Sequence, residues 1–270
     1  MRGHPFSKEM TTFVYIHSRD RCSGHPSDFS VTLPHPLVLD SRCKLRVDSV
    51  RIPNTYYTID ERNKFIYFGR QGYPDQYAEL PVGYYNATQL GVILTAALGA
   101  ANMASTYDAT RNTLQLDYWP GGVRTWWTLY TDAEVANMPG IWPPGVSASN
   151  VRSCNDILKN DPDPLTSSWL NNHHSYRINF LAVSPYDYVF LRSRRLASQN
   201  AISIRGEHDV LAMIPINAAF GEILTGGTPW GEALDIDATS LNQIDFLVTD
   251  RMGRPVDQRA DISFQLTFYQ

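Results

Sequence analysis

Short apolar segments of strand length recur along this chain, and they limit its possible folds more than any other feature. Each segment is rich in Val, Ile, Phe, Tyr and Thr and is bounded by Pro, Gly, Asn or Asp, which favour turns. The earlier segments are Thr12 to His17, Asp28 to Leu33, Cys43 to Ile52 and Lys64 to Phe68, followed by a strand, a polar turn and a second strand over residues 106–116. The later segments are Tyr176 to Val183, Asp187 to Arg192, Ala201 to Arg205, Val210 to Ile216, Gln243 to Thr249 and Ile262 to Phe268. So many short strands predict an all-β protein.

Two of these segments carry more specific predictions. The last one alternates between apolar and polar residues from Ile262 to Tyr269, which predicts a strand with one buried face. In the segment from Cys43 to Ile52 the alternation slips once, between Asp48 and Val50. Such a slip indicates either a β-bulge or a strand that is buried on both faces.

One segment has the period of a helix instead. Asn86 is a favourable N-cap, Gly99 is a plausible end, and the apolar residues between them share one face at helical spacing. This pattern predicts a helix over about residues 87–99. Together with the strands it predicts a jelly-roll β-sandwich with one helix and a loop-rich insertion.

The length of 270 residues allows one large domain or two small ones. Residues 119–175 have few clean strands and are dense in Trp, Pro and Gly, as in Trp119-Pro-Gly-Gly, and proline at this density disrupts regular ladders. We therefore predict a single jelly-roll domain over residues 12–270, with an inserted subregion at about 119–175. Residues 1–11 are polar enough to form an N-terminal arm that orders on assembly.

Composition narrows the classes of partner. The net charge of −4 argues against a protein that wraps nucleic acid directly, and no apolar run reaches the length of a membrane span. The basic residues are 19 Arg and only 4 Lys, and 12% of the chain is aromatic, which favours surfaces covered by neighbouring subunits, although genomic base composition could give the same Arg excess. Three widely spaced cysteines predict assembly in a reducing compartment.

Sequence motifs of common enzymes and metal sites are absent from the chain. The zinc-protease, nucleophile-elbow, P-loop, dinucleotide and EF-hand patterns do not occur, so we predict no catalytic residue, no cofactor and no metal. Asp235 and Asp237 could share one face of a strand and act as an acid and base pair. An ordinary solvent-exposed face explains this pair better.

Two clusters are candidates for interface or ligand contacts. The aromatic cluster includes Trp119, Trp126, Trp127 and Trp142, whose rings could stack on sugars, anchor a protein interface or form a small core. Arg192, Arg194 and Arg195 form a small basic group after a strand, for which a local ion-pair network is the simpler interpretation. A glycan-binding, lectin-like sandwich that uses the tryptophans is the alternative function.

Several stretches, in their joint order, resemble one family of viral proteins. They run from Asp28 to Leu37, from Val47 to Ile59, from Leu80 to Leu90 with Asn63 before them, and then through Ile214-Pro-Ile, Leu247 to Asp257 and Asp261 to Phe268. In this order they are similar to the minor capsid, or penton, proteins of virophages and polinton-like viruses. The similarity covers residues 12 to about 110 and 176–270 and leaves the Trp/Pro-rich middle unmatched.

The resemblance implies a structural role. It implies a jelly-roll capsid protein of the virion that forms homopentamers at the fivefold vertices of an icosahedral shell, beside a major capsid protein. It carries over no catalytic residue. A host receptor or a glycan is a further candidate partner of such a vertex protein.

Overall fold

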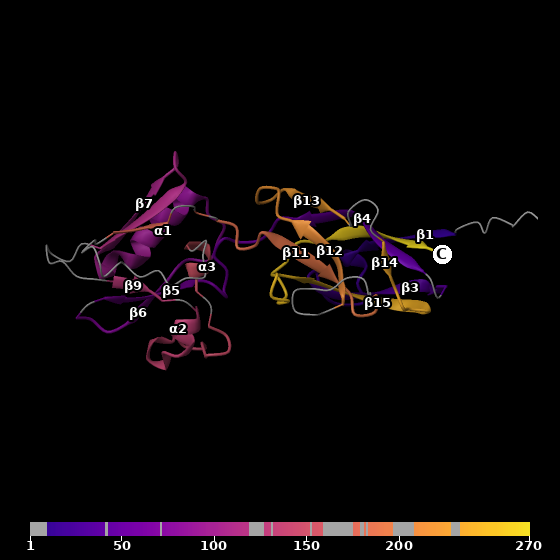
Figure 1. The fold of residues 1–270 in the computed structure, drawn as a ribbon, viewed down its shortest axis with the longest axis horizontal. Helices are drawn as coiled ribbons and strands as arrows, with labels where there is room; N and C mark the ends of the chain where they lie inside the picture. The colour runs from indigo at the N-terminus through magenta and orange to yellow at the C-terminus, as the bar shows by residue number, and fades with distance from the viewer. Residues whose placement is uncertain are drawn as a thin grey trace, which may run out of the picture. The chain divides into compact units, whose positions relative to one another are not determined.

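The structure is a computed structural model, and the chain forms two compact units. It describes residues 10–40, 43–70, 72–118, 127–130, 132–151, 153–158, 175–178, 181, 183–196, 208–227 and 233–270. The first unit combines the two ends of the chain, up to Tyr56 and from Tyr186 onward, and the second comprises Tyr57 to Pro185 (Figure 1).

The first unit is a sandwich of two antiparallel sheets. One sheet has the strand order β1-β16-β4-β13, with β14 also paired to β4, and the other has the order β12-β11-β15-β3-β2. The strands of this unit are β1 (Thr11–His17), β2 (Ser23–His25), β3 (Asp28–Val38), β4 (Lys44–Pro53), β11 (Tyr188–Arg192), β12 (Val210–Pro215), β13 (Ile223–Gly226), β14 (Leu234–Asp235), β15 (Ser240–Thr249) and β16 (Ser263–Tyr269), with a 3₁₀ helix at Ser18–Asp20.

Eight of these strands pair in the order of a jelly roll. In chain order they are β1, β3, β4, β11, β12, β13, β15 and β16. The first pairs with the last, the second with the seventh, the third with the sixth and the fourth with the fifth, always antiparallel. These four antiparallel pairs form one long hairpin that is rolled into two sheets. The further pairings of β16 with β4 and of β15 with β11 join the pairs within each sheet. The fold class predicted from the sequence is confirmed.

The core of the jelly roll lies between the two sheets. The alternation predicted for β16 is present, since Phe264, Leu266 and Phe268 are buried in this core. The slip predicted in β4 is a β-bulge: Ser49 has a φ of 51°, and the pairing with β16 shifts register there. The bulge returns Val50 to the core side after Val47.

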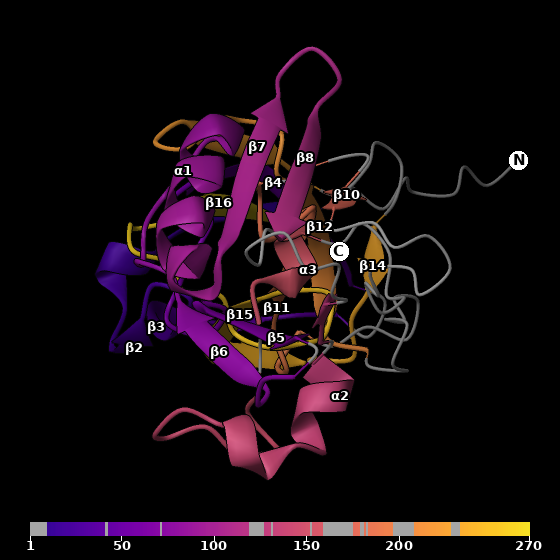
Figure 2. The ribbon, with the colours of Figure 1, turned by 90° about the vertical axis from the view of Figure 1, so that its left-hand side faces the viewer.

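The second unit contains two small sheets and the main helix. Its sheets have the orders β10-β8-β7 and β6-β5-β9. The elements are β5 (Phe65–Arg70), β6 (Gln76–Glu79), α1 (Ala87–Leu98), β7 (Met103–Asp108), β8 (Thr113–Tyr118), β9 (Trp127–Leu129), α2 (Asp132–Ala136), α3 (Asn155–Leu158) and β10 (Ser175–Ile178), with 3₁₀ helices at Gly99–Ala101 and Pro139–Ile141. Helix α1 packs along β7, as Figure 2 shows.

Helix α1 confirms the predicted start and end. The Asn86 side chain accepts from the Gln89 backbone N–H, and the Gln89 side chain accepts from the Asn86 N–H, which completes a capping box. Leu90, Leu94 and Leu98 are buried in the core of the second unit. Among the described residues, no helix has the length and apolar character that crossing a membrane requires.

The division of the chain differs from the single domain predicted over residues 12–270. The insertion lies between β4 and β11, and it comprises the whole of Tyr57 to Pro185 rather than residues 119–175 alone. The physical reason is burial: β5, α1, β7 and β8 place their apolar side chains in the core of the second unit and not in that of the jelly roll. At the N-terminus, Thr11 already belongs to β1, and Met10 pairs with Gln270, so these last two residues of the predicted arm are part of the sheet.

Candidate assembly surface

The tryptophans singled out from the sequence do not form an exposed binding face in the described structure. Trp127 is buried in the core of the second unit on β9. Trp142 is half-buried, and its indole N–H donates to the Val135 carbonyl oxygen at 2.7 Å. Trp119 and Trp126 lie outside the described residues. The two tryptophans that are described therefore pack within the second unit, which is the small-core interpretation of the cluster.

The three arginines after β11 differ in their surroundings. The Arg192 guanidinium is buried, where it donates to Thr249 Oγ1 and to Asp209 Oδ1, both at 2.9 Å. Arg194 and Arg195 are exposed, and their backbone N–H groups donate to the two carboxylate oxygens of Asp245 at 3.1 and 3.2 Å. Among the described contacts, the ion pair of this group is that of Arg192 with Asp209, so an ion-pair network that includes Arg194 and Arg195 stays a prediction.

The candidate catalytic carboxylates are exposed. Asp235 lies on β14, and its carboxylate is 3.9 Å from Lys44 Nζ, whereas Asp237 lies beyond the end of that short strand. No group of three or more His, Cys, Asp and Glu side chains that could hold a metal ion occurs in the part of the chain that the structure describes. The three cysteines, Cys22, Cys43 and Cys154, are free thiols.

Strand β1 presents aromatic side chains on the outer face of its sheet. Because neighbouring residues of a strand point to opposite faces, Val14 and Ile16 face the core while Phe13 and Tyr15 face outward. Phe13 is 54% exposed and Tyr15 is 77% exposed. We call these two residues the β1 patch.

Among the described strands, β1 lies at the edge of its sheet and pairs on one side only, with β16. Met10 and Gln270 exchange both backbone hydrogen bonds at 2.9 Å, and the Ser18 N–H donates to the Ile262 carbonyl oxygen at 2.9 Å. In an antiparallel pair, every second residue directs its backbone N–H and C=O toward the partner strand. Because Met10 bonds to Gln270, the backbone groups of Thr11, Phe13 and Tyr15 point away from β16. Within the described residues, nothing bonds to them. Such an edge is a template for another strand.

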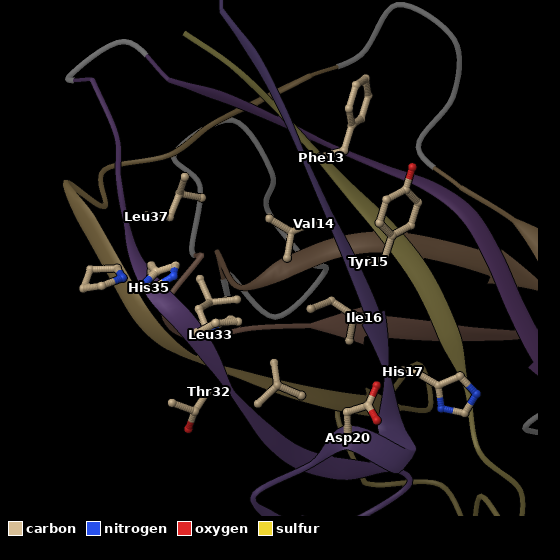
Figure 3. A pocket seen from close by; sticks show the side chains of 13 residues that line it. Phe13, Val14, Tyr15, Ile16, His17, Asp20, Thr32, Leu33, His35 and Leu37 are labelled. Carbon is tan, nitrogen blue, oxygen red and sulfur yellow. The ribbon is translucent and has the colours of Figure 1, made fainter.

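A groove opens between β1 and β3 at this edge of the sandwich. It has a volume of about 570 Å³, and its apolar floor comes from the core-facing side chains of both strands. Figure 3 shows Val14 and Ile16 on the groove side of β1, opposite Leu33 and Leu37 of β3, with Phe13 and Tyr15 pointing the other way.

The β3 side of the groove is irregular for a reason that is visible in the sequence. Pro34 and Pro36 have no backbone N–H to give to the ladder with β15, and the register between these strands shifts where the prolines lie. The four residues from Leu33 to Pro36 stand opposite a single residue of β15. This irregularity leaves Leu33 and Leu37 only partly covered.

A carboxylate anchors the far end of β1. Asp261 accepts from Ser18 Oγ at 2.9 Å and from the guanidinium groups of Arg19 and Arg21 at 3.3 and 3.2 Å. The Ser18 hydroxyl, and after it the Arg19 side chain, lower the pKa of Asp261 below its ordinary value. This cluster ties the end of β1 to the residues that lead into β16.

The Asp261 cluster makes stability depend on pH in the acid range. Since the pKa of Asp261 is lower in the folded than in the unfolded state, its contribution is present above about pH 4 and is lost as the pH falls through the folded pKa. We therefore expect Asp261→Asn to be less stable than the wild type at pH 6 and to approach it in acid. Thermal unfolding of both proteins at a series of pH values measures this, and a stability difference that does not shrink in acid would contradict it.

A second apolar patch lies at the opposite edge of the sandwich. On β11 and β12, Tyr188 stands opposite Pro215, and Phe190 stands opposite Met213. These four side chains lie on the outer face, because Val189 and Leu191 between them are buried in the core. Met213 is 52% exposed and Tyr188 is 45% exposed. We call these four residues the β12 patch.

The two patches lie on different sides of the jelly roll. Strand β12 ends one sheet next to β13, which ends the other, so this side of the sandwich is closed. Strand β1 lies at the other side, where it and β3 flank the groove. Neither patch was predicted from the sequence, in which the tryptophan cluster is the more conspicuous aromatic feature. The available signal was weaker: two aromatic residues at alternate positions of the first strand.

No protein-family model and no curated protein sequence matches this chain. In fold, the chain is similar to a penton protein. A crystal structure of the mavirus penton protein aligns with 97% of this chain and 99% of its own, at 11% sequence identity and a TM-score of 0.49.

Proposed function

We propose that this protein is a structural component of a viral capsid, a penton protein that forms homopentamers at the fivefold vertices of an icosahedral shell. The proposal also takes in a major capsid protein of the same virion as its neighbour. The resemblance of the sequence to minor capsid proteins supports the vertex position and the number five.

The observation that carries the proposal is the placement of the β1 and β12 patches on opposite sides of one jelly roll. A surface of one copy that fits a different surface of the next copy makes a head-to-tail contact, and such contacts close into rings when the rotation allows it. Exposed aromatic side chains and Met are the residue types enriched in protein interfaces. Each copy offers both surfaces.

The glycan-binding alternative receives no comparable support. It needs exposed tryptophans, and of the two cluster tryptophans that the structure describes, Trp127 is buried and the Trp142 indole N–H donates to Val135. Loss of binding on a glycan array in Trp142→Ala, with the oligomeric state unchanged, is the result that would favour the lectin-like alternative.

The direct test is the mass of the purified full-length protein. Multi-angle light scattering should give five times the 30.5 kDa mass of one chain, and negative-stain images should show fivefold rings. The proposal is wrong if the protein remains monomeric at every accessible concentration and is missing from virions.

A further inference from the structure

Two strand edges flank the groove between β1 and β3, and one of them is open to a further strand. Strand β1 pairs only with β16, and β2 covers only Asp28 to Ser30 of β3, so the remainder of β3 has no second neighbour among the described strands. Pro34 and Pro36 have no N–H to donate from β3, whereas β1 has neither a proline nor a charge from Thr11 to Ile16. Proline and charge are the usual protection of a strand edge. The β1 edge therefore lacks this protection.

A strand added beside β1 would bury its side chains at two positions. Residues that stand opposite each other in an antiparallel pair point to the same face of the sheet, so the residues opposite Val14 and Ile16 point into the groove. There they meet Leu33 and Leu37, which the jelly roll leaves partly covered (Figure 3). The floor of the groove therefore selects a strand with apolar side chains at two alternate positions.

The groove accepts only a segment that is not already part of a sandwich. In a second copy of this chain, the inward side chains of the edge strand lie against that copy's own core, as Val14 and Ile16 do here. They cannot also fill the groove of a neighbour. An isolated extended segment has both faces free, so it can bond to the β1 edge while it buries alternate side chains on the floor. This mode of recognition is β-strand addition.

Asp20 gives one end of the groove a negative charge. It lines the groove beyond the C-terminal end of β1, is exposed, and has no ion-pair partner among the described residues. The neighbouring Arg19 and Arg21 pair with Asp261 instead. A basic side chain of an added strand can therefore pair with Asp20. Because the pairs of this sheet are antiparallel, and antiparallel pairs are the more stable, this basic residue precedes the two apolar ones.

We propose that the groove binds an extended segment of another protein, which adds to the sheet antiparallel to β1. The segment has a basic residue, followed by apolar residues two and four positions later. Leu33 and Leu37 bind its apolar side chains, and Asp20 binds its basic one. The backbone groups of Phe13 and Tyr15 bond to its backbone, while their side chains point away from the groove (Figure 3). The site goes beyond the proposed function, because a single copy contains all of it.

A synthetic peptide tests the site on the full-length protein. The probe is the heptapeptide Lys-Thr-Val-Thr-Val-Thr-Thr, as long as β1, acetylated at its N-terminus and labelled with fluorescein at its C-terminus. Fluorescence anisotropy should show saturable binding that weakens at least tenfold with Leu33→Asp, because a charge then lies on the apolar floor. Asp20→Asn should weaken binding and remove most of its dependence on salt.

Two controls accompany the titration. Val92→Asp, on the exposed face of α1, should leave binding unchanged, and the peptide of reversed sequence should bind more weakly. Absence of saturable binding, or binding that Leu33→Asp does not affect in a folded variant, would overturn the proposal.

Backbone methylation distinguishes an added strand from a purely apolar contact. In the proposed register the fourth and sixth peptide residues stand opposite Tyr15 and Phe13, so their N–H groups point to β1, whereas the N–H groups of the two valines point away from it. N-methylation of the fourth and sixth residues should abolish binding, and N-methylation of the valines should preserve it. Equal effects of the two modifications would exclude strand addition. This comparison uses the wild-type protein, so it does not depend on the folding of any variant.

The oligomeric state separates this proposal from the proposed function. Leu33 lies outside both patches, so Leu33→Asp should form the same rings as the wild type in light scattering. If the folded variant forms no rings while the wild type does, the groove is a contact between copies and the binding proposal is wrong. If the wild type binds the peptide but forms no rings, the proposed function fails and the binding site stands.

Discussion

Phe246→Ala is expected to lower the free energy of unfolding of the jelly roll by about 3–5 kcal/mol, the usual cost of removing a buried ring. Phe246 of β15 is fully buried between two other rings. Its ring centroid lies 5.4 Å from that of Phe29 in the same sheet and 4.9 Å from that of Phe264 in the facing sheet. The substitution removes contacts on both sides at once and leaves a cavity where the two sheets meet. Urea unfolding followed by circular dichroism measures the loss.

A matched control separates the loss of core packing from the loss of an aromatic ring. Phe13→Ala removes the same side chain from the exposed face of β1, so its cost should stay within about 0.5 kcal/mol in the monomer. Both variants are compared at a concentration that keeps them monomeric. Equal stability losses for the two substitutions would mean that Phe246 does not lie in the core described above.

The strands that carry strong patterns could be predicted from the sequence. The alternation from Ile262 to Tyr269 gave both the strand and its buried face, and the slip after Asp48 marked the bulge at Ser49. The N-cap Asn86 located the start of α1. In each case the decisive interactions are local, so that a few neighbouring residues determine the structure.

Elements that depend on tertiary context could not be predicted. Strand β13 is only Ile-Leu-Thr-Gly, too short to show a period, and it becomes a strand because β4 offers a partner edge. The bounds of the insertion could not be predicted for a similar reason. The apolar face of α1 does not indicate which core will cover it. The amino-acid composition also does not change at Tyr57, where the second unit begins.

The candidate site escaped prediction for a different reason. An exposed residue on an edge strand has the same local sequence pattern as one in the middle of a sheet. Phe13 and Tyr15 can therefore be identified as a candidate contact surface only when the strand order is known. The tryptophans are conspicuous in the sequence because the chain has only six of them. Trp127, however, supplies core volume to a small unit, where large side chains fill space efficiently.

The head-to-tail contact leads to the second large expected effect. Tyr15→Glu damages only the β1 patch, and Met213→Glu damages only the β12 patch. Each places a charge in an interface, so each variant alone should lose its rings and appear monomeric by light scattering at concentrations where the wild type assembles. Val92→Glu, which charges a 66% exposed position on α1 outside both patches, should leave the rings intact.

Mixing the two damaged variants distinguishes head-to-tail assembly from every symmetric alternative. A Met213→Glu copy keeps its β1 patch, and a Tyr15→Glu copy keeps its β12 patch, so one intact junction can form between them and no more. The mixture should therefore give dimers containing one copy of each variant, and neither variant should dimerise alone. If the contact instead joined identical patches, at least one of the two variants would keep the self-complementary patch and would dimerise without the other. Light scattering of the separate and mixed samples decides between these outcomes, because only a heterologous contact requires both patches on different copies.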